Sequence, residues 1–196
     1  FDTRGVDLVF IIDISGSFEE EITSMIQGIS PLLEDPITSN FRFGLAVIGR
    51  QDRGVYEPEI NRHSEMVTNF VPANEFLEYL EAATLLEDGG IEPSIDAVLW
   101  SMNGMYPFAW TPGSQKVIIL MTDEIAQTIT STSVFQVNTY ATDQGYEIFV
   151  FALQEHHRSF IEMVRGEQRR LFTPTANSET VFQQIRQIFT DLCIPG

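Results

Sequence analysis

Hydrophobic and polar positions follow two alternating patterns along this chain. Continuous apolar runs that are rich in β-branched residues and lack gaps at helical spacing are typical of buried strands. Such runs predict strands over residues 6–12, 41–48, 66–71, 116–122, 147–153 and 171–173. The polar segment 49–63, which lies between two of them, is expected to be a long exposed loop.

Between the runs, apolar residues recur at spacings of three and four, which predicts amphipathic helices. The clearest example covers 18–33, where one face carries Ile22, Met25, Ile26, Ile29 and Leu33. The other predicted helices cover 74–83, 93–102, 133–144, 156–165 and 178–192. Asn74 is suited to cap a helix, Pro93 to begin one, and Gly145 to end one.

This alternation of strands and helices indicates an α/β fold. We expect a three-layer, doubly wound, mostly parallel six-stranded sheet with helices on both faces. Residues 66–71 are expected to pair as a hairpin and to form one antiparallel edge strand. A length of 196 residues suits a single domain over 1–196, large enough to bury a sizeable core.

The charge balance narrows the range of partners. A formal net charge of −17 argues against nucleic acid and anionic membrane surfaces, because both repel an acidic protein. No apolar stretch reaches the roughly 18 to 20 residues that cross a bilayer, so no direct membrane insertion is expected. Cys193 is the only cysteine, which leaves an idle thiol or a bridge to sequence outside this chain.

The first apolar run ends in a group of oxygen donors. Asp13, Ser15 and Ser17 follow it and share one parity, so a tightly turning backbone can aim all three side chains the same way. Carboxylate and hydroxyl oxygens are the hard donors that Mg2+ and Ca2+ prefer. The alternative is structural, with Asp13 and Ser15 forming a turn and Ser17 capping the next helix.

Two further acidic residues are expected near the same edge of the sheet. The apolar run 117–121 ends at Asp123, which would lie beside Asp13 if the two strands are parallel neighbours. Two carboxylates in one crevice repel each other unless a cation lies between them. Glu92 precedes the helix that Pro93 begins, where it is either a third ligand or a partner of the helix dipole.

These motifs resemble those of von Willebrand factor type A domains, also called integrin I-like domains, and the likeness covers essentially the whole chain. Asp13-Ile14-Ser15-Gly16-Ser17 matches the Asp-x-Ser-x-Ser motif that forms the first limb of the metal-ion-dependent adhesion site. Asp123 matches the aspartate of the third limb. Many members place a threonine in the second limb, whereas Glu92 resembles the glutamate of integrin β subunits and many bacterial members. Thr84 is the weaker candidate for that position.

The resemblance implies a function. Ser15 and Ser17 would bind Mg2+ directly, Asp13 and Asp123 would bind it directly or through water, and Glu92 would complete the protein ligands; Ca2+ or Mn2+ could replace Mg2+. An acidic side chain of a protein partner would then bind the metal. The chain would be a monomeric, non-enzymatic adhesion domain of a larger protein, located at the cell surface or outside the cell.

Further residues follow from the same resemblance. Glu20 and Glu21 occupy the positions of the aspartates that form an adjacent calcium site in integrin β subunits, although acids in a first helical turn also compensate the helix dipole. Ligand specificity is expected from two loops, through Arg50 and Tyr56 in the first and Tyr106, Phe108 and Trp110 in the second. The alternative for the loop aromatics is a local apolar cluster.

Two other functions remain open. Paired carboxylates with a metal can support hydrolysis, but the sequence has no glycine-rich phosphate loop and no histidine near the motifs above. Glu155-His156-His157 could suggest another metal site, but adjacent histidines on a helix point apart. An intracellular scaffold is the second alternative, because relatives of this fold also serve in assemblies inside the cell.

Overall fold

The sheet of this protein is built around a strand that is buried on both of its faces. A computed structural model describes residues 5–49, 63–83 and 91–192, apart from the side chains of Glu19 and Glu20. β1 (Val6–Asp13) is buried along its whole length. Its apolar side chains alternate between the two faces, as the period-two geometry of a strand requires. A continuous apolar run therefore marks the middle of the sheet.

The sheet has six strands in the order β3-β2-β1-β4-β5-β6. All neighbours are parallel except β2 and β3, which are antiparallel. The remaining strands are β2 (Phe41–Ile48), β3 (Ser64–Val71), β4 (Gln115–Met121), β5 (Tyr146–Phe151) and β6 (Leu171–Phe172). The predicted mostly parallel sheet with one antiparallel edge strand is confirmed.

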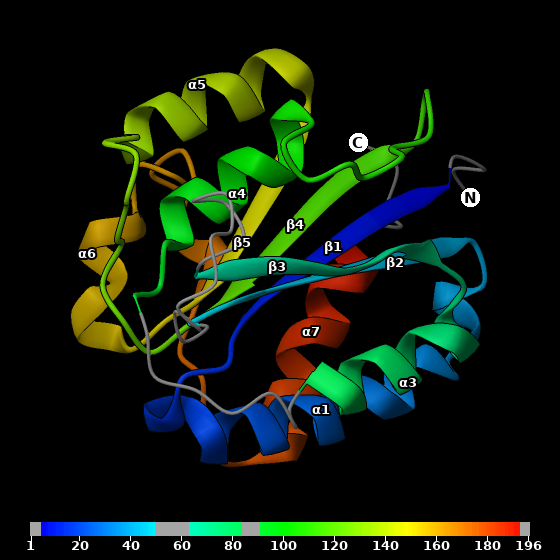
Figure 1. Cartoon of the computed structure of the whole chain (residues 1–196). Helices are drawn as coiled ribbons and strands as arrows, with labels where there is room; N and C mark the ends of the chain where they lie inside the picture. Colours follow the sequence, from blue (N-terminus) through cyan, green and yellow to red (C-terminus); the bar gives the residue numbers. More distant parts are fainter. Residues whose placement is uncertain (1–4, 50–62, 84–90, 193–196) are drawn as a thin grey trace.

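Helices cover both faces of the sheet (Figure 1). One face carries α1 (Glu19–Leu33), α3 (Ala73–Ala83) and α7 (Ser178–Leu192). The other face carries α4 (Ser94–Asn103), α5 (Val134–Gln144) and α6 (His157–Phe160). Each set packs on its own apolar cluster, and the sheet separates the two clusters. The predicted three layers are therefore confirmed. No helix in the described ranges is both long enough and apolar enough to cross a membrane.

Helix ends match the sequence signals in some places and differ in others. Ser133 caps α5 in a reciprocal pair with Gln136, and Gly145 ends this helix in a left-handed conformation (φ 73°). Asn74 is not a cap, because α3 begins one residue earlier, at Ala73, and the carbonyl of Pro72 accepts hydrogen bonds from the first turn.

The predicted helix over 156–165 is much shorter than expected. α6 ends at Phe160, and the chain continues in turns to Arg165, which is left-handed (φ 60°). The amide of Gly166 donates to the carbonyl of Ile161 at 2.8 Å and closes this segment. Its apolar residues are spaced as in a helix because they also pack on the sheet, but they do so from turns. Most of the predicted loop 49–63 lies outside the described residues.

Candidate metal centre

Asp13 is the last residue of β1 and is fully buried. The backbone amide of Ser15 donates to its Oδ1 at 2.9 Å, and the hydroxyl of Thr122 donates to its Oδ2 at 2.7 Å. A carboxyl group two residues before an amide forms such a turn readily. Both oxygens are therefore fixed at the carboxyl end of the sheet, where parallel α/β sheets bind ligands.

The two predicted serine ligands lie beside Asp13. Ser15 Oγ and Ser17 Oγ are 3.1 Å apart, with Ser15 buried and Ser17 exposed. A short 3-10 helix, η1 (Gly16–Phe18), makes the turn that brings the two hydroxyl groups together before α1 begins. Two hydroxyl oxygens at this separation can bind the same small cation.

Gly49 closes one side of this group. It follows β2 and adopts a left-handed conformation (φ 82°), which glycine tolerates best. A Cβ atom at this position would lie 2.9 Å from Asp13 Oδ1 and 3.1 Å from the amide nitrogen of Ser15. The absence of a side chain is therefore required for the Asp13 carboxyl to stay where it is.

Thr122 is a site residue that the sequence analysis missed. The β1–β4 register pairs Ile12 with Met121, so the next residues, Asp13 at the end of β1 and Thr122 directly after β4, lie side by side. The hydroxyl of Thr122 also accepts a hydrogen bond from the amide of Glu124 at 3.1 Å. The sequence did contain a signal for this role, because Thr122 is a hydroxyl residue directly before the predicted ligand Asp123 at the end of a parallel strand.

Asp123 follows Thr122 and has an unsatisfied oxygen. Its Oδ1 is buried and has no hydrogen-bond partner in the described part of the chain. A buried carboxylate oxygen without a donor is costly, and such atoms require an explanation such as a bound ion or water. The chemistry of this atom fits a cation nearby.

Glu92 lies just before α4 and is only 8% exposed. The side-chain amide of Gln127 is 3.5 Å from its Oε2, at the limit of a hydrogen bond. Gln127 belongs to the loop between β4 and α5 that also carries Asp123. The second and third predicted limbs are thus adjacent loops of the same edge.

Burial and like charges act on these carboxyl groups together. Burial raises the pKa of Asp13 to about 6, against the hydrogen bonds from Ser15 and Thr122, and the charge of Asp123 adds to the rise. Burial, followed by the charges of Asp13 and Glu124, raises the pKa of Glu92 to about 7. Among the residues that the structure describes, no cationic side chain contributes to either shift. The site therefore has excess negative potential.

The carboxyl groups alone do not form a metal cage. Within the described ranges, no three His, Cys, Asp or Glu side chains are grouped closely enough to hold an ion. The structure joins Asp13, Ser15 and Ser17 by local contacts, and it couples Asp123 and Glu92 to Asp13 through charge. Binding of a cation here would depend on the serine hydroxyls as well as on the carboxylates.

Asp7, at the other end of β1, shows how a buried carboxyl is satisfied without an external ion. It is 1% exposed, and Arg42 donates to it from Nε and Nη2, both at 2.8 Å. The Thr111 amide, at 2.5 Å, and the Ser114 hydroxyl, at 3.0 Å, also donate to it. Burial alone would raise the pKa of Asp7, but these donors hold it below its usual value. Asp123 Oδ1 has no such donor within residues 5–49, 63–83 and 91–192.

The predicted adjacent calcium site and the first specificity loop are largely outside the described part. This holds for the side chain of Glu20 and for Arg50 and Tyr56. Glu21 is half-buried in the first turn of α1. These assignments stay predictions.

The aromatic residues predicted for ligand specificity pack in the core instead. Tyr106 and Phe108 are only 2% and 7% exposed, so their prediction as surface contacts is wrong. The Tyr106 hydroxyl donates to Ser64 Oγ at 2.6 Å. Trp110 is half-buried, and its ring lies 5.0 Å from that of Tyr146. Apolar burial of these large rings outweighs their position in a loop, so they form the local cluster that was the alternative.

His157 does not form a second metal site with its neighbours. Its Nε2 lies 2.9 Å from the carbonyl oxygen of Ala152 and 3.2 Å from that of Phe172. Because carbonyl oxygens only accept, Nε2 carries the proton and is not free to bind a metal. The ring instead links the ends of β5 and β6.

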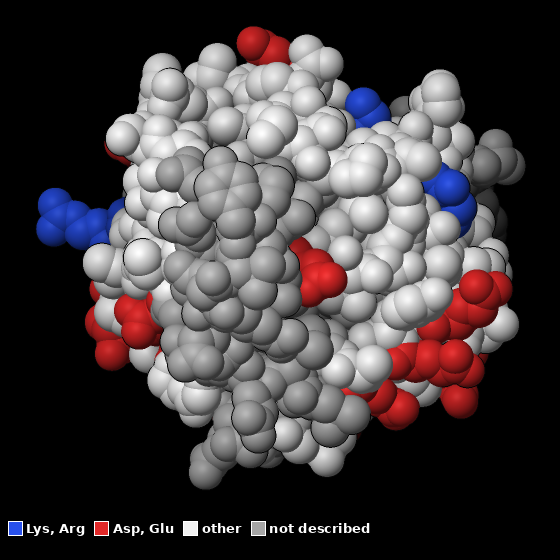
Figure 2. Space-filling view, viewed as in Figure 1, with Lys and Arg blue, Asp and Glu red and all other residues white. Residues whose placement is uncertain are grey.

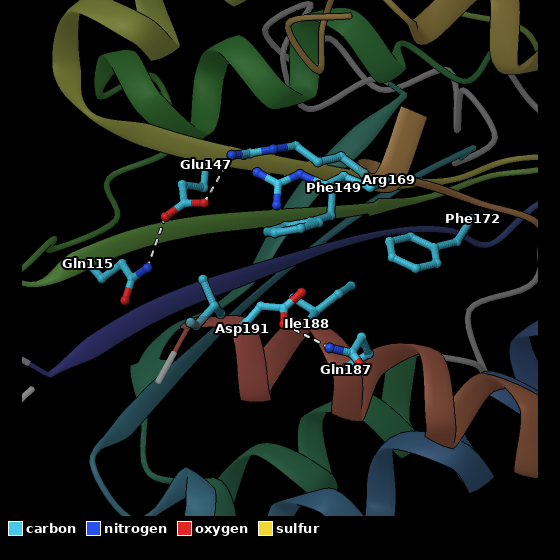
Figure 3. Close-up of a pocket in the computed structure, with 10 residues that line it drawn as sticks. Gln115, Glu147, Phe149, Arg169, Phe172, Gln187, Ile188 and Asp191 are labelled. Carbon is cyan, nitrogen blue, oxygen red and sulfur yellow. Dashed lines mark hydrogen bonds and ion pairs between the residues drawn. The ribbon is translucent and has the colours of Figure 1, made fainter. Parts of the chain in front are cut away.

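One cavity lies away from the candidate metal centre (Figure 3). It has a volume of about 230 Å³ and is lined by residues of β4, β5, β6 and the last turns of α7. Polar groups at its rim pair with one another: Gln115 with Glu147 at 2.9 Å, and Gln187 with Asp191 at 2.7 Å. Gln115 pairs with Val6 at the start of β1, whereas Asp13 is at its end. The cavity is therefore separate from the carboxylate group.

Acidic residues also gather on the outside of the molecule. Figure 2 shows negative side chains along one edge of the face that it views, over α3. This helix exposes Glu75, Glu78 and Glu81. The distribution agrees with the net charge of −17 and does not suggest a surface for polyanions.

Comparison with known proteins adds independent findings. A family model described as the von Willebrand factor type A domain matches residues 7–188. No curated protein matches the chain by sequence. A solved structure of proximal thread matrix protein 1 from the mussel byssus has a TM-score of 0.70 and 14% identity, over 97% of this chain and 47% of that chain.

A further structure of the mussel protein, described as having a zinc-occupied MIDAS motif, has a TM-score of 0.66 and 15% identity. That match covers 96% of this chain and 45% of the other. This chain thus spans about half the length of the solved chains. At such low identity the likeness shows the fold alone.

Proposed function

The chain belongs to the von Willebrand factor type A domain family, and from this membership we propose that it is a metal-dependent protein-binding domain. The metal would be held at the carboxyl ends of β1 and β4, and the partner would offer an acidic side chain. Domains of this family generally serve in protein interaction and adhesion, which agrees with the proposal.

One observation carries the proposal. Asp123 Oδ1 is buried with no hydrogen-bond donor from the described residues, at the same edge where Asp13 and Glu92 already repel each other. At the opposite end of β1, the buried carboxyl of Asp7 has Arg42 as its cation. A divalent cation would supply at Asp13 and Asp123 the positive charge that Arg42 supplies at Asp7, and it would attract the carboxylate of a partner.

The chain's own residues have distinct roles in this proposal. Ser15 and Ser17 offer hydroxyl oxygens, and Asp123 offers the oxygen that lacks a donor. Thr122 and the amide of Ser15 hold the Asp13 carboxyl in place. Glu92 adds a carboxylate from a separate loop, which raises the negative charge of the ligand set.

The nature of the metal follows from these donors. Carboxylate and hydroxyl oxygens favour Mg2+, with Ca2+ and Mn2+ as alternatives. The zinc in the MIDAS motif of the mussel protein supports metal binding at such a motif, and it adds Zn2+ to the ions to be compared. We also propose an extracellular location, because the matched protein is a matrix protein of the byssus.

Calorimetric titration with Mg2+, Ca2+, Mn2+ and Zn2+ in separate runs tests metal binding. Asp13→Ala is expected to abolish the binding of the preferred ion and the stabilisation that this ion gives against heat. Asp7→Ala is the matched control, since it removes a buried carboxyl from the other end of the same strand and should leave the metal affinity unchanged. Unaltered binding in Asp13→Ala would contradict the assignment.

The partner is tested separately, with an immobilised array of short peptides that contain Asp or Glu and matched peptides that contain Asn or Gln. Retention only on the acidic peptides, only with the metal, and not for Asp13→Ala is expected. Metal-dependent turnover of a phosphoester such as p-nitrophenyl phosphate, without retention, would instead favour a hydrolase.

A further inference from the structure

Asp96 is a fully buried carboxyl group whose partners all come from one loop. It lies in the first turn of α4, four residues after Glu92. Its Oδ2 accepts a hydrogen bond of 2.6 Å from the amide of Ile129, and its Oδ1 accepts from the hydroxyls of Thr128, at 3.1 Å, and Thr130. The donors belong to the segment between β4 and α5.

A second set of hydrogen bonds, nearer the candidate metal centre, also joins this loop to α4. The amide of Gln127 donates to Ser94 Oγ at 3.2 Å, and the amide of Ile95 donates to the carbonyl of Gln127 at 3.0 Å. The side chain of Gln127 reaches Glu92 at 3.5 Å. The start of α4 and this loop therefore form one connected unit, in which Ser94 and Asp96 are both fully buried.

The conformation of the loop also depends on these contacts. Ser131, one residue after Thr130, is left-handed with φ 64°, a strained conformation for a residue other than glycine. Thr128 Oγ1 accepts from the amides of Thr130 and Thr132 at 3.2 and 3.1 Å, which shapes the bend on either side of Ser131. The hydroxyls that Asp96 binds thus belong to the bend itself.

This arrangement joins two of the proposed metal limbs. Asp123 lies in the loop that Asp96 holds, and Glu92 lies directly before the helix that carries Asp96. We infer that Asp96 is a positioning residue of the candidate metal centre. Its hydrogen bonds hold the β4–α5 loop against α4 and so set the separation of Glu92 and Asp123. This inference rests on the proposed function, because it needs those two residues to share an ion.

Metal titration of variants tests the inference. Asp96→Ala is expected to weaken binding of the preferred ion by tenfold to a hundredfold, the usual range for groups that orient metal ligands. Asp96→Asn keeps an oxygen for the Ile129 amide and should restore most of the affinity. Asp7→Ala is the control, because it removes an equally buried carboxyl without touching the loop, and its affinity should equal that of the unaltered chain.

A second pair of measurements applies if Asp96→Ala does not fold. Thr130→Val removes one hydroxyl that donates to Asp96, at an exposed position of the bend, and should reduce the metal affinity severalfold. Hydrogen exchange of the metal-free Thr130→Val chain should be faster in residues 123–130 and unchanged in β1.

The outcomes separate the two proposals. Absence of metal binding by the unaltered chain overturns the proposed function and the inference with it. If the unaltered chain binds the ion while Asp96→Ala or Thr130→Val binds it equally well, only the inference is overturned. Equal weakening by Asp7→Ala and Asp96→Ala also overturns it, since a purely structural role would act through stability alone.

Discussion

The hydroxyl of Thr122 donates a 2.7 Å hydrogen bond to Oδ2 of Asp13, across the junction of β1 and β4. This hydrogen bond connects Asp13, in the first predicted limb, to Thr122, which directly precedes Asp123 of the third limb. Together with the amide of Ser15, it fixes the orientation of the Asp13 carboxyl.

The first prediction concerns this bond. Thr122→Val keeps the shape of the side chain but removes the donor, so the Asp13 carboxyl loses one of its two fixed contacts. We expect a tenfold to hundredfold loss of metal affinity in a calorimetric titration, as is typical for outer-shell partners. Thr122→Ser, which retains a hydroxyl, should lose much less. Equal affinities for the two variants would show that the bond does not orient Asp13.

The second prediction concerns the close approach at Gly49. Gly49→Ala places a Cβ 2.9 Å from Asp13 Oδ1 in a left-handed conformation, so it should cost about 1–3 kcal/mol of unfolding free energy and abolish metal stabilisation. Gly104→Ala is the control, because Gly104 is equally left-handed (φ 86°) but has nothing within 4 Å. It should cost stability alone. Loss of metal stabilisation in both variants would refute a local role for Gly49.

The third prediction concerns the contact between α1 and α7. A Cβ on Gly28 would lie 2.9 Å from the amide nitrogen of Phe182 and from the carbonyl oxygen of Ser178. Gly28→Ala should therefore force the two helices apart and lower the free energy of unfolding by about 1–3 kcal/mol in urea titrations. Gln27→Ala, at the exposed neighbouring position, should be close to neutral. A neutral Gly28→Ala would mean that the helices can separate without cost.

The fourth prediction concerns acid stability. The pKa of Asp7 is held below its usual value, so the ionised carboxyl stabilises the fold above about pH 4, and this stabilisation is lost as the pH falls further. Asp7→Asn removes the pH-dependent part and should cost about 1–3 kcal/mol at neutral pH. Urea unfolding between pH 2.5 and 7 measures both. An unchanged slope below pH 4 in Asp7→Asn would contradict this account.

The fold was predictable because its strongest signals are local. The continuous apolar run of β1 reflects burial on two faces, and Asp13 is the first residue beyond the hydrophobic layer. The parity of Asp13, Ser15 and Ser17 correctly anticipated that the serine hydroxyls come together. Glu92 and Asp123 lie at the same edge of the sheet, close enough for their charges to interact.

Other features depended on contacts between distant segments. The Tyr106 hydroxyl pairs with Ser64 from another part of the chain, and no local pattern indicates that a loop tyrosine is buried. Thr122 required the register of β1 and β4, which fixes which hydroxyl lies beside Asp13. The role of Asp96 required the path of the β4–α5 loop, whose donors are 32 to 34 residues away in sequence.

Asp13 lies six positions after Asp7 on β1, a path of about 20 Å at the rise of a strand. At this separation two unit charges interact by less than about 1 kcal/mol at an effective dielectric constant of about 20, so the two carboxyl groups affect each other only weakly. Acid protonates Asp13, whose pKa is raised to about 6, before it reaches Asp7, whose pKa is lowered, whereas a chelator would act on the Asp13 end alone. The two ends of β1 can thus be perturbed separately, by a chelator at Asp13 and by substitution at Asp7. The end that is left unchanged then serves as an internal reference.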